Sequence, residues 1–264
     1  MKTKIKLLST ILFLSTLISF SQKKINASDI MEDIKDGKDI SYNNSTIVGV
    51  LDFTFMDEAL QNLPKKKKSW WNWGNNYSDN TVKKIIENKI SFTNCTFTDD
   101  VLAYIPDENS GYTFVASFEE KVIFSKCIFE RKAMFKYSKF EREADFTDAN
   151  FEDDTTFKYA KFDQNISFSN TKFREPATFK NTKFRKKVSF ENSIFEESAT
   201  FKYTKFYNGV SFKNVAFNED LNLKYTEVSG DFDITGMKVA YDIDSKYTKI
   251  NGKSFNKYLL NNRN

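Results

Sequence analysis

The stretch from Ala177 to Phe206 reads ATFKNTKFRKKVSFENSIFEESATFKYTKF, and its phenylalanines follow one another at steps that alternate between five and six residues. The same alternation runs without a break from Phe124 to Phe217. Aliphatic residues then continue the series at Leu223, Val228, Ile234 and Val239. The sequence therefore repeats with a period of eleven residues or a multiple of eleven, which is the sign of a repeat architecture.

The repeat predicts short strands and excludes a helix. A step of five residues turns about 500° on an α-helix, so the two phenylalanines of one repeat would lie about 140° apart. The residue two before each phenylalanine, from Val122 to Val215, is always small or β-branched. Residues two apart share one face of a strand. Each unit is thus a short strand with two inward side chains, followed by a polar corner such as Ser125 or Glu130.

The segment ADFTDANFEDDTTFKYAKF, Ala144 to Phe162, resembles the pentapeptide-repeat family, whose units carry a central Leu or Phe and a small residue two positions earlier. The resemblance extends over about residues 90–239. It implies an all-β fold, a right-handed quadrilateral β-helix (solenoid) with four short faces in each coil. The extra residue at every second corner lengthens the coil from about 20 to about 22 residues, a period that suits a solenoid. Tyr137, Tyr159 and Tyr203 lie on this grid.

The chain divides into five segments, and we expect the two ends of the solenoid to carry short capping helices. The first cap lies in SDIMEDIKDG, with Asp29 as its N-cap and Gly37 as its end, and the other lies in GKSFNKYLLNNR. The expected segments are a signal peptide (1–21), a cap helix with irregular first rungs (22–53), a Lys/Trp-rich insertion (54–89), the β-helix with a loop insertion near 98–115 (90–240), and a C-terminal cap (241–264).

The N-terminal segment, 1–21, indicates export. Three lysines precede an apolar run from Leu7 to Phe20, which is too short for a good membrane span, and Ser19 and Ser21 suit a cleavage site before Gln22. We expect a mature protein in the periplasm, on the cell surface or outside the cell, with no transmembrane anchor once the signal is removed.

The two cysteines, Cys95 and Cys127, both fall two residues before a phenylalanine, on the inward column of small residues. If the insertion near 98–115 is a loop, they stack in adjacent coils at about 4.8 Å. That spacing suits a disulfide, and an exported protein meets an oxidising compartment. Two buried free thiols are the alternative.

The composition argues against common catalytic and metal chemistry. The sequence has no histidine, which removes Ser-His-Asp and Cys-His nucleophiles and most zinc sites. We therefore expect no cofactor and no bound metal, although stacked acids such as Glu152 and Glu196 form an acidic corner that is a conceivable calcium site. The net charge of +4 by itself says nothing about a nucleic-acid partner, and only the distribution of charge could. We expect a protein partner or an anionic polymer rather than nucleic acid.

One corner of the coil repeats a pattern of lysine and tyrosine, which we name the Lys/Tyr column. Its residues are Lys136, Tyr137, Lys139, Lys158, Tyr159, Lys161, Lys180, Lys183, Lys202, Tyr203, Lys205, Lys224 and Tyr225. Stacking places like charges about 5 Å apart, which a polyanion along the column would neutralise. The alternative is a solvated edge copied by repeat duplication.

All three tryptophans, Trp70, Trp71 and Trp73, follow the lysine run 65–68 in the first insertion. Tryptophan beside lysine suits a lipid headgroup, a sugar ring or a protein partner. The alternative is a loop whose aromatic side chains pack on the first coils.

The sequence thus predicts an exported, non-catalytic scaffold that mediates protein or envelope interactions. A polyanion- or anionic-glycan-binding module that uses the Lys/Tyr column is the alternative, and a β-helical carbohydrate-active enzyme is a second one. The pentapeptide-repeat resemblance also implies that a homodimer joined end to end is an option. Some family members protect topoisomerases through an acidic surface, but the positive charge and the export signal of this chain depart from that pattern.

Overall fold

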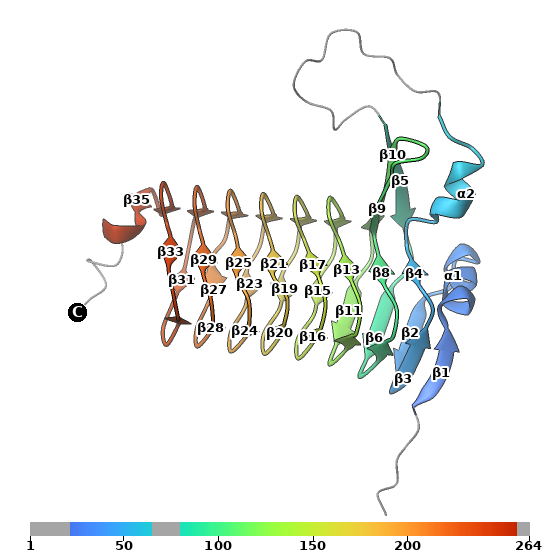
Figure 1. The fold of residues 1–264 in the computed structure, drawn as a ribbon, viewed down its shortest axis with the longest axis horizontal. Coiled ribbons are helices and arrows are strands. Elements are labelled where there is room, and N and C mark those ends of the chain that lie inside the picture. Colours follow the sequence, from blue (N-terminus) through green and yellow to red (C-terminus); the bar gives the residue numbers. More distant parts are fainter. Residues whose placement is uncertain (1–21, 65–79, 258–264) are drawn as a thin grey trace, which may run out of the picture.

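A computed structural model describes residues 22–64 and 80–257, which form a tube of stacked coils with four parallel sheets along its length (Figure 1). Each complete coil contributes one short strand to each of four faces, which we number in chain order. Face 1 contains β2 (Ile40–Asn43), β6 (Ile90–Thr93), β11 (Val122–Ser125), β15 (Ala144–Asp145), β19 (Ile166–Ser167), β23 (Val188–Ser189), β27 (Val210–Ser211) and β31 (Phe232–Asp233). Face 2 contains β1 (Lys23–Asn26), β3 (Ser45–Val48), β7 (Thr96–Phe97), β12 (Ile128–Phe129), β16 (Asn150–Phe151), β20 (Lys172–Phe173), β24 (Ile194–Phe195), β28 (Ala216–Phe217) and β32 (Lys238–Val239).

The other two faces complete the tube. Face 3 contains β4 (Leu51–Asp52), β8 (Val101–Leu102), β13 (Ala133–Met134), β17 (Thr155–Thr156), β21 (Ala177–Thr178), β25 (Ala199–Thr200), β29 (Leu221–Asn222) and β33 (Ile243–Asp244). Face 4 contains β5 (Thr81–Ile86), β10 (Tyr112–Phe118), β14 (Lys139–Phe140), β18 (Lys161–Phe162), β22 (Lys183–Phe184), β26 (Lys205–Phe206), β30 (Glu227–Val228) and β34 (Lys249–Ile250), with β9 (Tyr104–Asp107) and β35 (Lys253–Ser254) paired antiparallel to its strands. The predicted four-sided solenoid is confirmed.

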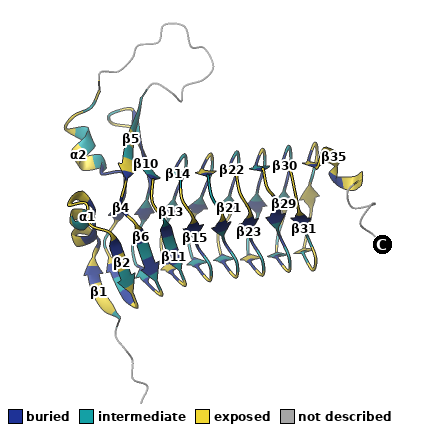
Figure 2. Ribbon diagram, turned by 180° about the vertical axis from the view of Figure 1, so that it is seen from behind, coloured by how far each residue is buried: buried dark blue, intermediate teal, exposed yellow. Residues whose placement is uncertain are grey.

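The interior of the tube is a set of phenylalanine stacks. The phenylalanines of the repeat, from Phe118 to Phe217, are all buried, as are the small residues two positions before them (Figure 2). As far as Phe195, each ring stacks on the ring that follows one coil later in the sequence, as Phe173 does on Phe195. Their ring centroids lie 4.6 Å apart, with 9° between the ring planes. The alternating steps of five and six residues therefore place one aromatic ring on each face of the coil.

Several buried hydroxyls on the small-residue column form hydrogen bonds that join neighbouring coils. The Thr182 hydroxyl donates to the carbonyl oxygen of Phe157 at 2.7 Å, and the Thr204 hydroxyl donates to that of Phe179 at 2.6 Å. Because a buried hydroxyl without a partner costs about 1–3 kcal/mol, this bond explains how threonine replaces alanine on an inward position.

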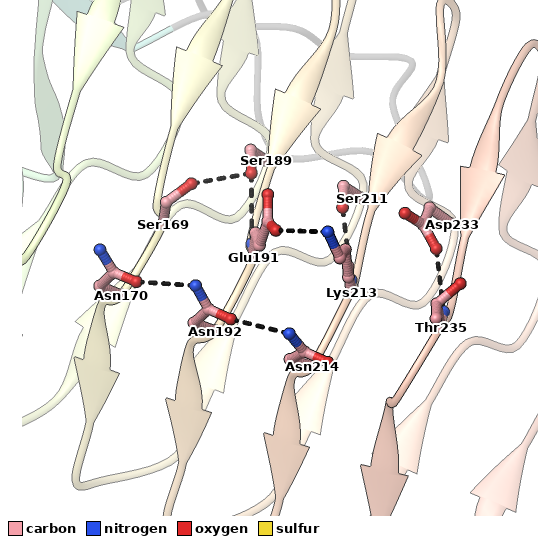
Figure 3. Close-up of polar contacts among 10 residues, drawn as sticks. All are labelled: Ser169, Asn170, Ser189, Glu191, Asn192, Ser211, Lys213, Asn214, Asp233 and Thr235. Carbon is pink, nitrogen blue, oxygen red and sulfur yellow. Dashed lines mark hydrogen bonds and ion pairs between the residues drawn. The ribbon is translucent and has the colours of Figure 1, made fainter.

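The five-residue steps turn the corner through a residue in the left-handed region. Tyr159, Asn181 and Tyr203 have φ values of 62°, 59° and 60°, and Asn170 and Asn192 do the same at the other five-residue corner, with 57° and 59°. Asparagine tolerates this region better than most residues. The side-chain amide of Asn192 donates to Asn170 Oδ1 at 3.1 Å, which adds an asparagine ladder along that corner (Figure 3).

The N-terminal end is covered by α1 (Ala27–Lys35), which lies against the first coil (Figure 1). The predicted N-cap, Asp29, is wrong: Asn26 precedes the helix and Asp29 lies in its first turn. The helix starts earlier because Ala27, Ile30 and Ile34 share one buried face, which needs helical backbone from Ala27 onward. Gly37 lies just past the helix in the left-handed region, with a φ of 76°.

The segment expected to hold irregular first rungs is regular. Strands β2, β3 and β4 pair in register with the next coil, for example Ile47 with Phe97 and Leu51 with Val101. In the segment 54–89, α2 (Met56–Leu60) follows the first coil, and β5 then supplies the first strand of face 4. The insertion is therefore shorter than predicted, since its last residues belong to the β-helix.

Two further boundaries differ from the sequence prediction. The segment near 98–115 is not a loop, because Val101 lies on face 3 and β9 and β10 form a hairpin that extends face 4. The β-helix also continues past residue 240, since β33 and β34 extend the ladders of faces 3 and 4 as far as Ile250. Residues 255–257 begin the predicted C-terminal helix, and the remainder of it lies outside the described residues.

Candidate binding site

The Lys/Tyr column lies along the corner between faces 3 and 4. Tyr137, Tyr159 and Tyr203 each occupy the left-handed position two residues after a buried phenylalanine, with one lysine before and a second lysine two residues after, on the outer side of face 4. Tyr225 follows Leu223 instead, and Glu227 takes the place of its second lysine. The second set is in register, as Lys161, Lys183 and Lys205 pair directly between neighbouring strands. The coil thus converts a sequence pattern into two parallel rows of lysine with a row of tyrosine between them.

The tyrosines of the column stack on one another outside the tube. Tyr137 and Tyr159 have ring centroids 4.9 Å apart, and Tyr203 and Tyr225 have centroids 4.7 Å apart, with the ring planes within 10° of parallel. The preceding lysines lie beside these rings, with Nζ of Lys158 5.4 Å from the centroid of Tyr159 and Nζ of Lys202 5.3 Å from that of Tyr203. Such cation–π contacts hold the charged groups near the ring row.

The column is longer than the sequence analysis predicted. Tyr247 stacks on Tyr225 at 4.8 Å, and Lys246 and Lys249 complete a sixth row. The signal was present in the sequence, because Tyr247 follows Tyr225 by the same interval that separates Tyr203 from Tyr225. The regular series of inward apolar residues ends at Val239, so the pattern of buried residues alone did not extend the column to Tyr247.

The electrostatics of the column are uneven. Burial, and then repulsion from Lys136 and Lys180, lowers the pKa of Lys158. Lys205, in contrast, forms an ion pair of 3.0 Å with Glu227, which raises its pKa. The centre of the column therefore has lysines that repel one another, and an anion placed there would relieve that repulsion.

The column borders an open groove of about 600 Å³. Its lining residues are Tyr159, Asn181, Lys183, Tyr203, Lys205, Tyr225, Glu227, Tyr247 and Lys249. The groove therefore joins the tyrosine row to the outer lysine row of face 4, and five of its lining residues belong to the predicted site. Lys136, Tyr137 and Lys139 lie at the far end of the same corner, beyond the groove.

Some acids of the corner between faces 2 and 3 pair with basic neighbours. Arg174 pairs with Glu152 at 2.6 Å, and Lys172 pairs with Glu196 at 2.6 Å. Repulsion from Glu219 is the largest cause that raises the pKa of Glu197. Within residues 22–64 and 80–257, no three acidic or cysteine side chains gather closely enough to hold a metal ion.

A second hollow, of about 530 Å³, lies on face 1 and was not predicted. Ser167, Ser189 and Ser211 form its floor, between Asp145 and Asp233. These hydroxyls are used within the coil, as Ser189 and Ser211 accept from the backbone N–H groups of Glu191 and Lys213 (Figure 3). Its signal was the serine that recurs in three successive coils, at Ser167, Ser189 and Ser211, on the outward side of face 1.

The cysteines stand directly before neighbouring strands of face 2, where Ile128 N–H donates to the carbonyl oxygen of Cys95 at 2.9 Å. Both thiols are free and buried, and burial raises the pKa of the Cys127 thiol.

We expect denatured, unreduced protein to release two titratable thiols, and the native protein to react far more slowly, because both thiols are shielded from solvent in the interior of the tube. Thiol titration with and without denaturant measures both. A count of zero in denaturant would establish a disulfide instead.

The tryptophans Trp70, Trp71 and Trp73 lie outside the described residues, so their predicted roles stay predictions. Over the part of the chain that the structure covers, no helix has the length and apolar character needed to cross a membrane.

The stacked coils define a β-helical repeat protein, built from four faces and the corners between them. The family model described as pentapeptide repeats (9 copies) matches residues 116–161, 157–205 and 179–227. The repeat region of this chain therefore belongs to the pentapeptide-repeat family, whose repeats fold as a right-handed β-helix. No significant match to the chain is found among curated proteins or solved structures.

Proposed function

We propose that this repeat scaffold is an exported, non-catalytic protein that binds a negatively charged partner along the Lys/Tyr column. The observation that carries the proposal is the pair of lysine rows in register beside a groove of about 600 Å³. Rows of like charge raise the local potential, which attracts an elongated anion. The family supports the scaffold, and the binding and the export are our inference.

The central lysines favour such a partner over a merely solvated edge. The pKa of Lys158 is lowered by burial and by two lysine neighbours, so the folded chain holds this charge at a cost that a bound anion offsets. Export is supported by the lysines and the apolar run of residues 1–21. A mature N-terminus near Gln22 in the protein recovered from outside the cytoplasm would support it, and an intact Met1 would contradict it.

Binding of a polyanion is tested on a heparin column with the mature protein. We expect retention that decreases with salt, because exposed charges are screened over about 8–10 Å near 0.1 M salt. The variant Lys158→Glu, Lys180→Glu, Lys202→Glu should lose on the order of 100-fold in affinity at low salt, at about 1 kcal/mol for each lysine.

The matched control reverses three exposed lysines away from the column, Lys186→Glu, Lys187→Glu and Lys238→Glu. It changes the net charge equally, so it should retain most of the binding if the column is the site. Equal loss in both variants, or no retention of the wild type at low salt, would remove the column as a binding site.

A further inference from the structure

The tyrosine row of the column lacks one ring. Tyr159 stacks on Tyr137, and Tyr203 stacks on Tyr225, but Asn181 stands in the row between Tyr159 and Tyr203. Among the described residues, no aromatic ring lies between these two tyrosines. Tyr159 and Tyr203 therefore each have one ring face stacked on a neighbouring tyrosine and the other face directed toward the coil that contains Asn181.

We propose that this gap is a slot for one flat aromatic ring, supplied by an acidic, extended peptide segment of a partner protein. The proposal rests on the proposed function of the Lys/Tyr column and names the chemistry of its partner. The slot belongs to the groove, whose lining includes Tyr159, Asn181 and Tyr203.

The dimensions of the slot follow from the coil spacing. Tyr159 and Tyr203 are two coils apart, about 9.6 Å along the tube. One tyrosine in the middle would reproduce the spacing of 4.7–4.9 Å that the existing pairs adopt. A guest ring as thick as a phenol therefore stacks on both of its faces at the distance that the row already uses.

Asn181 leaves the slot open because its side chain is short. Its φ of 59° matches the 62° and 60° of Tyr159 and Tyr203, so its Cβ leaves the backbone in the same direction. The amide of Asn181 reaches only as far as the first three atoms of a tyrosine ring would, so the space of the outer part of the ring stays open. The two flanking tyrosines are 36% and 41% exposed, and both line the groove together with Asn181.

Charge selects the class of molecule that carries the ring. Lys180 and Lys183 belong to the same coil as Asn181, and Lys158 and Lys202 belong to the coils on either side of it. A ring entering the slot therefore lies in a part of the column where lysine predominates, which favours an acidic segment as its carrier. The six coils of the column span about 24 Å along the tube. A peptide of seven extended residues has a similar length, roughly 23 Å.

A peptide fits this arrangement better than a nucleic acid or a polysaccharide. A single strand of nucleic acid offers a base at every nucleotide, whereas the other ring faces of the row cover one another. The flanking rings are planar and nearly parallel to their neighbours, which suits a planar guest more than a puckered sugar. An acidic peptide with one aromatic side chain would fill the single slot with its ring and pair its carboxylates with several lysines.

The test compares three labelled heptapeptides that have three glutamates on each side of phenylalanine, alanine or cyclohexylalanine. Fluorescence anisotropy at low salt with the mature protein gives each Kd. We expect the phenylalanine peptide to bind on the order of tenfold more tightly than the alanine peptide, because aromatic stacking adds to the charge attraction. Cyclohexylalanine has a similar volume but no flat face, so its peptide should bind more weakly than the phenylalanine peptide.

Two variants of one residue locate the effect. Asn181→Tyr completes the tyrosine row and should make the three peptides bind equally, while its melting temperature stays at or above that of the wild type. Asn181→Gly keeps the left-handed backbone and the open slot, so the preference for phenylalanine should persist.

The outcomes separate the slot from the column. If the wild type binds all three peptides with equal affinity, the slot is wrong and the column stands. If no peptide binds at low salt, both are wrong. If the phenylalanine preference survives in Asn181→Tyr, the ring binds elsewhere. A single-stranded oligonucleotide of equal charge that binds more tightly than the peptides, and loses that affinity in Asn181→Tyr, would overturn the peptide assignment.

Discussion

Replacing Phe157 with alanine should lower the free energy of unfolding by about 3–5 kcal/mol, the usual cost of removing a large buried side chain. Phe157 is fully buried, and its ring stacks on Phe135 and Phe179, each at 5.2 Å. It also meets Phe146 and Phe168 edge to face at 5.4 and 5.1 Å. The substitution therefore removes these ring contacts and leaves a cavity in the middle of the tube.

Urea unfolding followed by far-ultraviolet circular dichroism measures this loss. Tyr207→Ala is the matched control, because it also removes an aromatic ring, but one that is 49% exposed. Its effect should stay within about 0.5 kcal/mol. Similar losses in the two variants would contradict the aromatic stack as the main source of stability. Because each coil contacts only its neighbours, a broadened transition in Phe157→Ala would mean that the two halves unfold separately.

Gly209→Ala is expected to have the second largest effect, a loss of about 2–5 kcal/mol from backbone strain together with overpacking. Gly209 has a φ of 85°, and a Cβ atom there would lie 2.8 Å from the carbonyl oxygen of Asp231 in the next coil. Backbone atoms on both strands are held by the ladder, since Gly209 N–H donates to the carbonyl oxygen of Ser229 at 2.7 Å. The clash therefore has no flexible side chain to relieve it.

Gly37→Ala provides the control for the strain alone. Gly37 has a φ of 76°, but nothing lies within 4 Å of the position that its Cβ would take. It should cost only about 1–2 kcal/mol in the same urea titration. If Gly37→Ala and Gly209→Ala lose equal stability, the close approach of neighbouring coils at Gly209 contributes nothing.

The sequence predicted the tube because burial alone sets its period. Phenylalanine at alternating steps, with a small residue two positions earlier, leaves only one arrangement in which both columns face inward. The same logic placed the Lys/Tyr column correctly on one corner, because the residues next to a buried ring must point outward. Its groove could not be predicted, since the groove depends on how the rows of faces 3 and 4 meet.

The parts that the sequence did not predict are those without the repeat pattern. The hairpin of β9 and β10 extends face 4, yet Tyr112 to Phe118 contains an apolar run that periodicity alone cannot assign to a loop or a strand. The start of α1 was misplaced because Asp29 is a good N-cap residue, while packing of Ala27 and Ile30 decides where the helix begins. The left-handed corners went unrecognised because tyrosine rarely adopts that backbone conformation.

Every coil adds the same rise, so the length of the tube is proportional to the number of coils. Inserting one further copy of a single coil, such as 159–180, would lengthen every face by about 4.8 Å and leave the width of the tube unchanged. Duplication of a coil in evolution would therefore change the length of the protein in fixed increments. Each added coil would also add one set of side chains to the surface at every corner. Related chains would then differ in their number of coils, while the residues that each coil places on the surface stayed the same.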